Sequence, residues 1–232
     1  LNAVLERGRC APCILTGNAN PSGKLPMTFP VTLSDHWSSL NFPIDQKIDR
    51  RWSVKTGLTH ETKNVDYTIY DEGIYVGYRW FDTRNLQVSY PFGYGLSYTT
   101  FEYGKPSVKQ DNGKVIVEVT VKNTGKVAGK EAVQLYVEAP AGKLDKPVHE
   151  LKAFGKTKML QPGASQVITL AVHTDDLASF DEDACAWVTD GGRYKFVVAA
   201  SSRDPRGDVM VDVSPSTRKV NNVLNLPAAF KK

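Results

Sequence analysis

The feature that most constrains the fold of this chain is the alternation of residues 115 to 122, which read V-I-V-E-V-T-V-K. Successive side chains of a β-strand point to opposite faces, so the four valines form one row that faces a core. Asn123-Thr124-Gly125 follows directly, and these residue types favour a turn. The segment therefore predicts a strand with one buried face.

Further strands are expected on both sides of this segment. One begins near Tyr103, and the turn dipeptides Pro162-Gly163, Gly191-Gly192 and Asp204-Pro205 separate the later ones. The segments rich in β-branched and aromatic residues are 132–137, 151–154, 167–172, 194–199 and 209–213. About seven short strands at this spacing are typical of a β-sandwich of the immunoglobulin or fibronectin III type. We expect inward rows of Val, Leu, Phe and Trp187 to form its core.

A dense aromatic stretch, Tyr90 to Tyr103, precedes the sandwich and includes Phe92 and Tyr94. Six of its fourteen residues are aromatic. Exposed aromatic groups gain nothing from water, so we expect this stretch to be packed on both sides. It divides the chain into residues 1–101 and residues 102–232, two unlike halves that it would join.

The N-terminal half carries weaker signals. Residues 1 to 17 fit short helical pieces that end at Gly17, and Leu25 to Phe29 fits an extended piece that Pro30 ends. Residues 31 to 64 have no sustained period, which indicates a long excursion over a surface. Residues 66 to 81 contain eight large apolar or aromatic groups around Asp71, Glu72 and Arg79. These charged groups either pair or bind backbone, or they contact a ligand.

Composition excludes several classes of function. The formal net charge of +4 comes from interspersed charges, whereas nucleic-acid binding needs a concentrated basic face. No apolar run approaches the roughly 20 residues of a membrane span. The acidic group at 175–183 lacks the spacing of an EF-hand loop, and the four histidines are scattered, so no metal site is expected. No secretory signal is visible.

Two short motifs suggest chemistry. Cys10-Ala-Pro-Cys13 is similar to a redox pair, but a helix is expected before it where such a pair needs a strand, which favours simple packing. Ser34-Asp35-His36 contains the residue types of a catalytic triad, but neighbours in an extended loop diverge. The residues alone therefore predict no complete catalytic site, no metal and no cofactor.

Five blocks in order along the chain resemble glycoside hydrolase family 3, whose members include β-glucosidases. Three resemble successive blocks of its α/β sandwich domain, and two resemble its C-terminal fibronectin III-like domain. They are N-P-S-G-K-L-P-M-T-F-P at 20–30, D-E-G-I-Y-V-G-Y-R-W-F at 71–81, P-F-G-Y-G-L-S-Y-T-T-F at 91–101, V-K-N-T-G-K-V-A-G-K-E-A-V-Q-L-Y-V at 121–137 and L-K-A-F-G-K-T-K-M-L-Q-P-G-A-S-Q at 151–166.

The resemblance implies the C-terminal part of a larger enzyme: the end of an α/β sandwich domain with its linker in 1–101, and a fibronectin III-like β-sandwich with a C-terminal tail in 102–232. The parent would hydrolyse β-linked oligosaccharides or aryl glycosides with retention, using an aspartate nucleophile in an upstream barrel and a glutamate acid/base. Both would precede this chain, so neither Asp35 nor Glu72 is assigned catalysis. The resemblance also implies a periplasmic or secreted parent protein.

The aromatic blocks then supply candidates for the rim of the sugar site or for a domain interface, because ring faces stack on sugar CH groups and exclude water. The candidates are Glu72, Tyr75, Tyr78, Arg79, Trp80, Phe92 and Tyr94. A non-catalytic carbohydrate-binding or adhesion module is the alternative, which exposed aromatic residues on the sandwich would favour.

Overall fold

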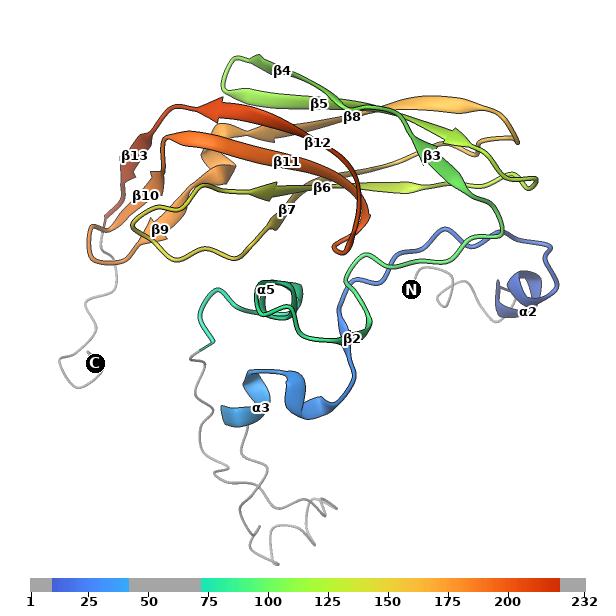
Figure 1. Ribbon diagram of the computed structural model, residues 1–232, viewed down its shortest axis with the longest axis horizontal. Coiled ribbons are helices and arrows are strands. Elements are labelled where there is room, and N and C mark those ends of the chain that lie inside the picture. Colours follow the sequence, from blue (N-terminus) through green and yellow to red (C-terminus); the bar gives the residue numbers. More distant parts are fainter. Residues whose placement is uncertain (1–9, 42–71, 222–232) are drawn as a thin grey trace, which may run out of the picture.

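The computed structural model describes residues 10–41 and 72–221 of the chain (Figure 1). The helix expected over residues 1–9, the excursion over 42–64 and the tail beyond 221 lie outside the described residues. Within them, β-strands predominate and form four antiparallel sheets.

Two of these sheets face each other as a β-sandwich. In the first, β5 pairs with β8 along one edge. Along its other edge β5 pairs with two strands, with β4 at residues 114–118 and with β3 at residues 121–123. In the second, the order is β12-β11-β6-β7. The strands are β3 (Phe101–Tyr103), β4 (Ser107–Asp111), β5 (Lys114–Asn123), β6 (Ala132–Glu138), β7 (Glu150–Lys156), β8 (Ser165–His173), β11 (Gly192–Ser201) and β12 (Asp204–Val213). This arrangement confirms the predicted fibronectin III-like sandwich.

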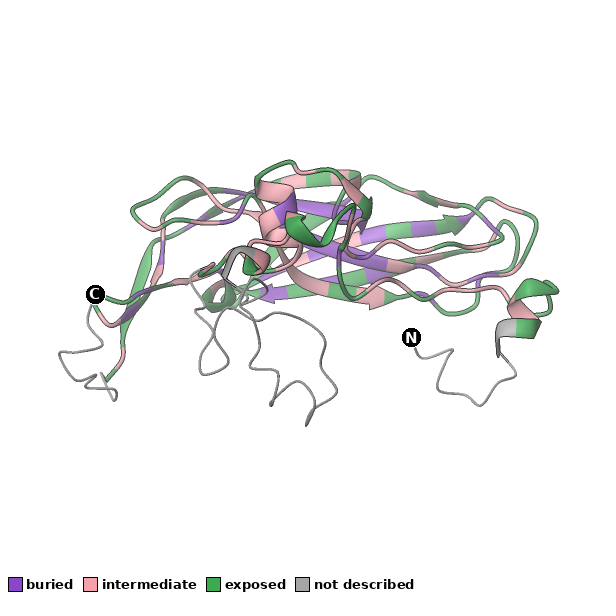
Figure 2. Cartoon of the chain, turned by 90° about the horizontal axis from the view of Figure 1, so that it is seen from below, coloured by how far each residue is buried: buried purple, intermediate pink, exposed green. Residues whose placement is uncertain are grey.

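The core of the sandwich follows the predicted alternation. The four valines of β5 are buried on one face, and they pack against alternate residues of β6, β8 and β11 such as Leu135, Leu170 and Phe196. Figure 2 shows the same alternation of buried and exposed positions along the strands. Burial of these branched side chains, at about 25 cal/mol per Å² of apolar surface, drives the two sheets together.

β6 and β11 differ from β5 because both of their faces are covered. Residues 133–137 and 196–202 are buried without interruption, whereas β5 exposes or half-exposes every second residue. One face of this sheet points into the sandwich. The other face meets the N-terminal segment of the chain, through residues such as Tyr78 and Phe92. A continuous apolar run is what a strand covered on two faces requires.

The covering segment is built from short elements that lie beneath this sheet in Figure 1. β1 and β2 pair with each other as a two-stranded sheet, and α5 lies against β6 and β11 through the side chains described below. The elements are α2 (Cys10–Leu15), β1 (Phe29–Pro30), a 3₁₀ turn η1 (Leu33–Asp35), α3 (Ser38–Asn41), α5 (Tyr78–Thr83) and β2 (Val88–Tyr90). Gly17 ends α2 with φ of 76°, as predicted.

The fourth sheet was not predicted. It has the order β13-β10-β9 and lies at one end of the sandwich, after a short 3₁₀ turn η2 (Thr174–Leu177) (Figure 1). Its strands are β9 (Ser179–Asp181), β10 (Ala186–Thr189) and β13 (Ser216–Lys219). Trp187 belongs to this sheet and is 38% exposed, so its expected place in the sandwich core is wrong.

Three further expectations need correction. Pro205 is not in a turn but pairs with Ala199 inside β12, where an edge strand tolerates a missing N–H; the turn lies at Ser202 and Arg203. The described part of the expected excursion forms η1 and α3. The stretch from Tyr90 to Tyr103 is not packed along its whole length, since Tyr90 and Tyr98 are exposed; residues 91–95 are buried or half-buried, and from residue 96 exposed positions alternate with less exposed ones.

Candidate functional site

The junction between α5 and the sandwich is an aromatic stack. Tyr78 stacks on Phe92 with ring centroids 4.7 Å apart, and the edge of its ring meets Tyr136 of β6. His149 packs against Tyr136 at 4.9 Å, and the Leu151 N–H donates to the Tyr78 hydroxyl at 2.8 Å. Such pairs each stabilise by about 0.5–1.5 kcal/mol beyond their buried area. The stack fixes α5 to the outer face of the sheet.

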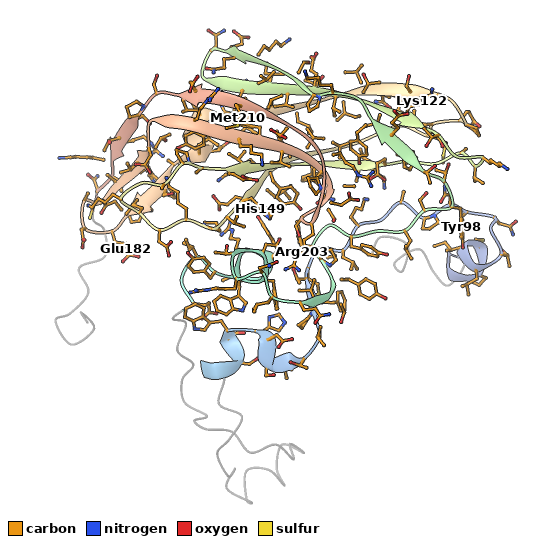
Figure 3. All side chains as sticks on the ribbon, viewed as in Figure 1. Tyr98, Lys122, His149, Glu182, Arg203 and Met210 are labelled. Carbon is orange, nitrogen blue, oxygen red and sulfur yellow. The ribbon has the colours of Figure 1, made fainter. Side chains whose placement is uncertain are left out.

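A buried carboxylate lies beside the stack. Asp82 Oδ2 is 3.1 Å from His149 Nε2, and Arg203 Nε donates to Asp82 Oδ1 at 2.6 Å. Arg203 also donates to the Phe81 carbonyl at 3.0 Å. In Figure 3 the labelled His149 and Arg203 lie between the sandwich and the α5 segment. The Asp82 side chain is only 5% exposed, so both oxygens serve the junction.

These hydrogen bonds set the protonation of the carboxyl. Burial alone would raise the pKa of Asp82, but the hydrogen bonds from His149 and Arg203 outweigh burial and hold that pKa below its usual range. The carboxylate is therefore ionised at neutral pH. It pairs with a guanidinium from the turn between β11 and β12, 121 residues later in sequence.

Stability is expected to fall at acid pH because of this group. The pKa of Asp82 is lower in the folded state than the roughly 3.9 of an unfolded chain. Its stabilisation is thus complete above the unfolded value and is lost as the pH falls through the folded one. Urea midpoints measured from about pH 6 down to about pH 3 should fall more steeply for the native chain than for Asp82→Asn. Equal pH dependence of the two proteins would contradict this role.

A second buried network lies under Gly93. Gln134 of β6 donates to the Gly93 carbonyl at 3.1 Å and to the Ala200 carbonyl at 2.9 Å. Burial raises the pKa of Tyr136, so its hydroxyl stays protonated and donates to Gln134 Oε1 at 2.6 Å. The positive φ of 77° at Gly93 lets the backbone approach the amide this closely.

The block at residues 20 to 30 is tied to the same face. The Asn20 amide donates to the Ala128 carbonyl, and its oxygen accepts from the Tyr98 N–H at 2.8 Å. Lys24 Nζ pairs with the mostly buried Glu131 at 2.9 Å. Leu25 exchanges backbone hydrogen bonds with residues 93 and 94. The N-P-S-G-K-L block and the P-F-G-Y-G block are therefore two sides of one tether.

An aromatic pocket of about 190 Å³ opens on the other side of α5. Trp37 packs against Trp80 at 4.6 Å and lies parallel to Tyr75 at 6.5 Å. Glu72 and Thr28 also line it, and their buried Oε2 and Oγ1 atoms have no hydrogen-bond partner among the described residues. Ring faces beside polar oxygens suit a sugar ring, which presents CH groups and hydroxyls.

The candidate residues from the sequence thus separate into two groups. Tyr78 and Phe92 lie in the junction, and Tyr94 packs against Tyr90 of β2 at 5.2 Å. Glu72, Tyr75 and Trp80 line the aromatic pocket. Arg79 pairs with Glu150 of β7 at 2.9 Å.

Sequence reasoning missed the residues of the sandwich that complete these sites. Gln134, His149 and Arg203 belong to the sandwich and Asp82 belongs to α5, and no sequence pattern separates them from ordinary polar residues. Trp37 directly follows Ser34-Asp35-His36 in sequence, and nothing in that context predicts its place in an aromatic pocket. The sequence carries a usable signal only for the covered face of the sheet. The uninterrupted apolar run of β11 predicts a strand that is buried on both faces.

The motifs that suggested chemistry have structural partners instead. The Asp35 carboxylate accepts the Thr32 N–H at 2.8 Å, and this backbone hydrogen bond is the main reason that the pKa of Asp35 is lowered. Ser34 bonds Thr32, while His36 packs edge-on against Phe81 at 5.1 Å. Cys13 is a free thiol, and the side chain of Cys10 lies outside the described residues.

Among the described residues, no group of three or more His, Cys, Asp and Glu side chains is placed to hold a metal ion. The same part of the chain contains no helix with the length and apolar character needed to cross a membrane.

The fold and its junction define a fibronectin III-like sandwich held to the end of another domain. Residues 131–202 match the fibronectin type III-like domain, and residues 5–78 match the glycosyl hydrolase family 3 C-terminal domain. The chain belongs to glycosyl hydrolase family 3 and is the C-terminal part of such proteins, which confirms the resemblance.

Relatives agree with this assignment. The chain is 41% identical to β-glucosidase A of Butyrivibrio fibrisolvens over 224 residues, which cover 87% of this chain and 25% of that protein. β-Glucosidase BoGH3A of Bacteroides ovatus is 39% identical over 210 residues, with 87% and 25% covered. The chain therefore spans about a quarter of the length of these relatives.

Solved structures give the same picture. β-Glucosidase 3B from Thermotoga neapolitana in complex with glucose superimposes with a TM-score of 0.78 and 43% identity, over 92% of this chain and 27% of that one. The β-glucosidase from Kluyveromyces marxianus in complex with glucose gives a TM-score of 0.79 at 33% identity, over 91% and 24%. Both comparisons include the sandwich and the covering segment.

Proposed function

We propose that this chain is the non-catalytic C-terminal part of a retaining β-glycosidase of the β-glucosidase or β-xylosidase type. Its role is to brace the end of the α/β sandwich domain against the fibronectin III-like domain and so to hold the rim of a sugar site. The relatives are named β-glucosidases, and two of the superimposed structures hold glucose, which supports a β-linked glycoside as the substrate of the parent.

The observation that carries this proposal is the double use of Asp82. Both of its oxygens bind residues of the sandwich, Oδ1 to Arg203 and Oδ2 to His149. A nucleophile of a retaining glycosidase must instead present a free oxygen to the sugar, with a second carboxyl about 5–5.5 Å away. Asp82 thus links α5 to the sandwich, and through α5 it holds the aromatic pocket in place.

The rim assignment extends the same argument. Glu72, Tyr75 and Trp80 line the aromatic pocket; Trp80 is on α5, whereas Glu72 and Tyr75 precede it, and the Tyr75 hydroxyl donates to Asp145 of the sandwich at 2.7 Å. Because one face of α5 is held against the sandwich, a side chain on its other face, such as Trp80, can bind a ligand with little loss of conformational entropy. In the parent enzyme we assign these three residues to the rim of the sugar site. The upstream barrel and α/β sandwich domains would form the rest of that site.

The isolated chain is expected not to hydrolyse glycosides. Incubation with an aryl β-glucoside and an aryl β-xyloside should release no aryl alcohol above a buffer blank, because both oxygens of the buried Asp82 carboxylate are bound by His149 and Arg203. Asp35→Asn and Glu72→Gln are the matched variants. Turnover by the native chain that either variant abolishes would contradict the non-catalytic assignment.

A further inference from the structure

The small sheet β13-β10-β9 carries a ladder of large side chains on one face. Trp187 of β10 lies directly opposite Phe180 of β9 and directly opposite Arg218 of β13. Residues paired across antiparallel strands project to the same face, so the three side chains form one surface. Trp187 and Phe180 are 38% and 41% exposed, with ring centroids 5.2 Å apart. The fibronectin III-like core does not use them.

This ladder forms one wall of a groove of about 1000 Å³. The opposite wall belongs to the covering segment and includes Trp37, Glu72 and Tyr75, which also line the aromatic pocket. The strands of the ladder lie at the end of the sandwich next to α5 (Figure 1), and Glu182, labelled in Figure 3, lies at the same end. Two aromatic surfaces from different parts of the chain therefore meet one open groove.

The groove is lined by more acidic than basic side chains. Six carboxylates line it against three cations, among the residues that the structure describes. Glu150 is paired with Arg79 and with Lys152, and Asp145 accepts the Tyr75 hydroxyl at 2.7 Å. The carboxylates of Asp175, Asp176 and Glu182 add further hydrogen-bond acceptors along the wall that carries Trp187. Such a lining accepts hydroxyl donors and repels anions.

We propose that this groove binds a neutral β-linked gluco-oligosaccharide of several sugar rings, stacked on Trp187 and Phe180 at one wall and on Trp37 and Tyr75 at the other. The proposal rests on the proposed function and adds an extended substrate to it. Pyranose CH faces pack on the indole and phenyl rings, and sugar hydroxyls donate to the carboxylates. A β-1,4-linked glucuronic-acid chain has the same backbone as the glucan but carries carboxylates, which the groove repels.

The size of the groove favours an oligosaccharide over a single sugar. A volume of about 1000 Å³ is at the upper end of the roughly 300–1,000 Å³ that holds a drug-sized ligand. The pocket at Trp37 and Trp80, at about 190 Å³, is much smaller and suits a single ring. A chain that extends from that pocket toward Trp187 would contact both aromatic surfaces.

The test is calorimetric titration of the 232-residue chain with cellohexaose, cellobiose and β-1,4-linked hexaglucuronate. We expect cellohexaose to bind at least about tenfold more tightly than cellobiose, which corresponds to about 1.4 kcal/mol, and hexaglucuronate not to bind. Trp187→Ala should weaken cellohexaose about tenfold. Phe154→Ala is the matched control, since Phe154 is 74% exposed on β7 and outside the groove, and its affinity should equal that of the native chain.

A second readout protects the test against misfolding of the variant. In the native chain the indole N–H signals of Trp37 and Trp187 should shift on addition of cellohexaose, and Phe180→Ala should weaken binding as Trp187→Ala does. Equal affinity for cellohexaose and cellobiose, equal binding of hexaglucuronate, or an unaffected Trp187→Ala protein would each overturn the proposal. Self-association that Trp187→Ala abolishes, without glucan binding, would assign this face to a second copy of the chain.

The outcomes separate this proposal from the proposed function. Absence of cellohexaose binding removes only the groove assignment, because bracing by Asp82 is tested by unfolding and the non-catalytic role by aryl glycosides. Turnover of an aryl glycoside that depends on Asp35 or Glu72 would remove the proposed function, whatever binds in the groove.

Discussion

Gly93→Ala is expected to lower the free energy of unfolding by about 3 kcal/mol, although it adds a single methyl group. The residue has φ of 77°, a conformation that costs an alanine about 1 kcal/mol. A Cβ at this position would also fall 2.7 Å from the Gln134 side-chain carbon Cδ. Gln134 must then give up buried hydrogen bonds to Gly93 and Ala200, and each lost bond costs about 1–3 kcal/mol.

Urea denaturation followed by circular dichroism measures this loss, and hydrogen exchange locates it. The amides of Gly93 and Ser202 should exchange faster, because they bond the Leu25 and Phe92 carbonyls across the tether. Gly163→Ala is the matched control: it has φ of 80°, but no atom lies within 4 Å of its added Cβ. It should lose only about 1 kcal/mol. Equal losses in the two variants would mean that the contact with Gln134 has no energetic role.

The sandwich was predictable because its signal is local. In β5 one face meets the core and the other meets water, so burial alternates with the period of the strand. The fibronectin III-like class follows from several such strands separated by turns. The small sheet β13-β10-β9 in the same half was not predicted, and the cause is also local. Its strands β9 and β10 have only three and four residues, too few to show a period.

The junction could not be predicted in the same way, because its chemistry depends on contacts between residues far apart in sequence. Asp82 and Arg203 are 121 residues apart, and Asn20 and Ala128 are 108 apart. Nothing near Asp82 distinguishes it from a surface aspartate until β11 and β12 place the guanidinium beside it. The family blocks mark these regions as important, but the roles of their residues come from the folded contacts.

The placement of Trp187 shows the opposite error. A tryptophan between apolar neighbours in a β-rich chain is expected in the core, because burial of a large ring is favourable. Here Ala186 occupies the buried face of β10, and Trp187 points to the other face. Strand register decides between these two faces, and a shift of one residue reverses them. The alternation of four residues was too short to fix that register.

Asp82→Ala is expected to lower the free energy of unfolding by about 3 kcal/mol, as other buried ion pairs do when one partner is removed. The carboxylate is 5% exposed and Arg203 is 29% exposed, so the guanidinium would lose its charged partner without becoming fully hydrated. His149 would lose its partner as well. Since all three groups lie where α5 meets the sandwich, protease cleavage in residues 72–95 should accelerate together with the loss of stability.

A double-mutant cycle with Arg203→Ala isolates the interaction of the pair. The double variant should lose less stability than the two single variants together, by about 1–2 kcal/mol, because removal of both partners leaves no unpaired group. Asp204→Ala, at the residue after Arg203, is the matched control. Asp204 pairs with Arg206, and its carboxylate is 46% exposed. Such exposed pairs contribute at most about 1 kcal/mol. If Asp82→Ala and Asp204→Ala lose the same stability, Asp82 does not hold the two domains together. A large loss confined to Asp82→Ala, with faster cleavage of residues 72–95, identifies the buried carboxylate as the group that holds α5 and its aromatic pocket against the sandwich.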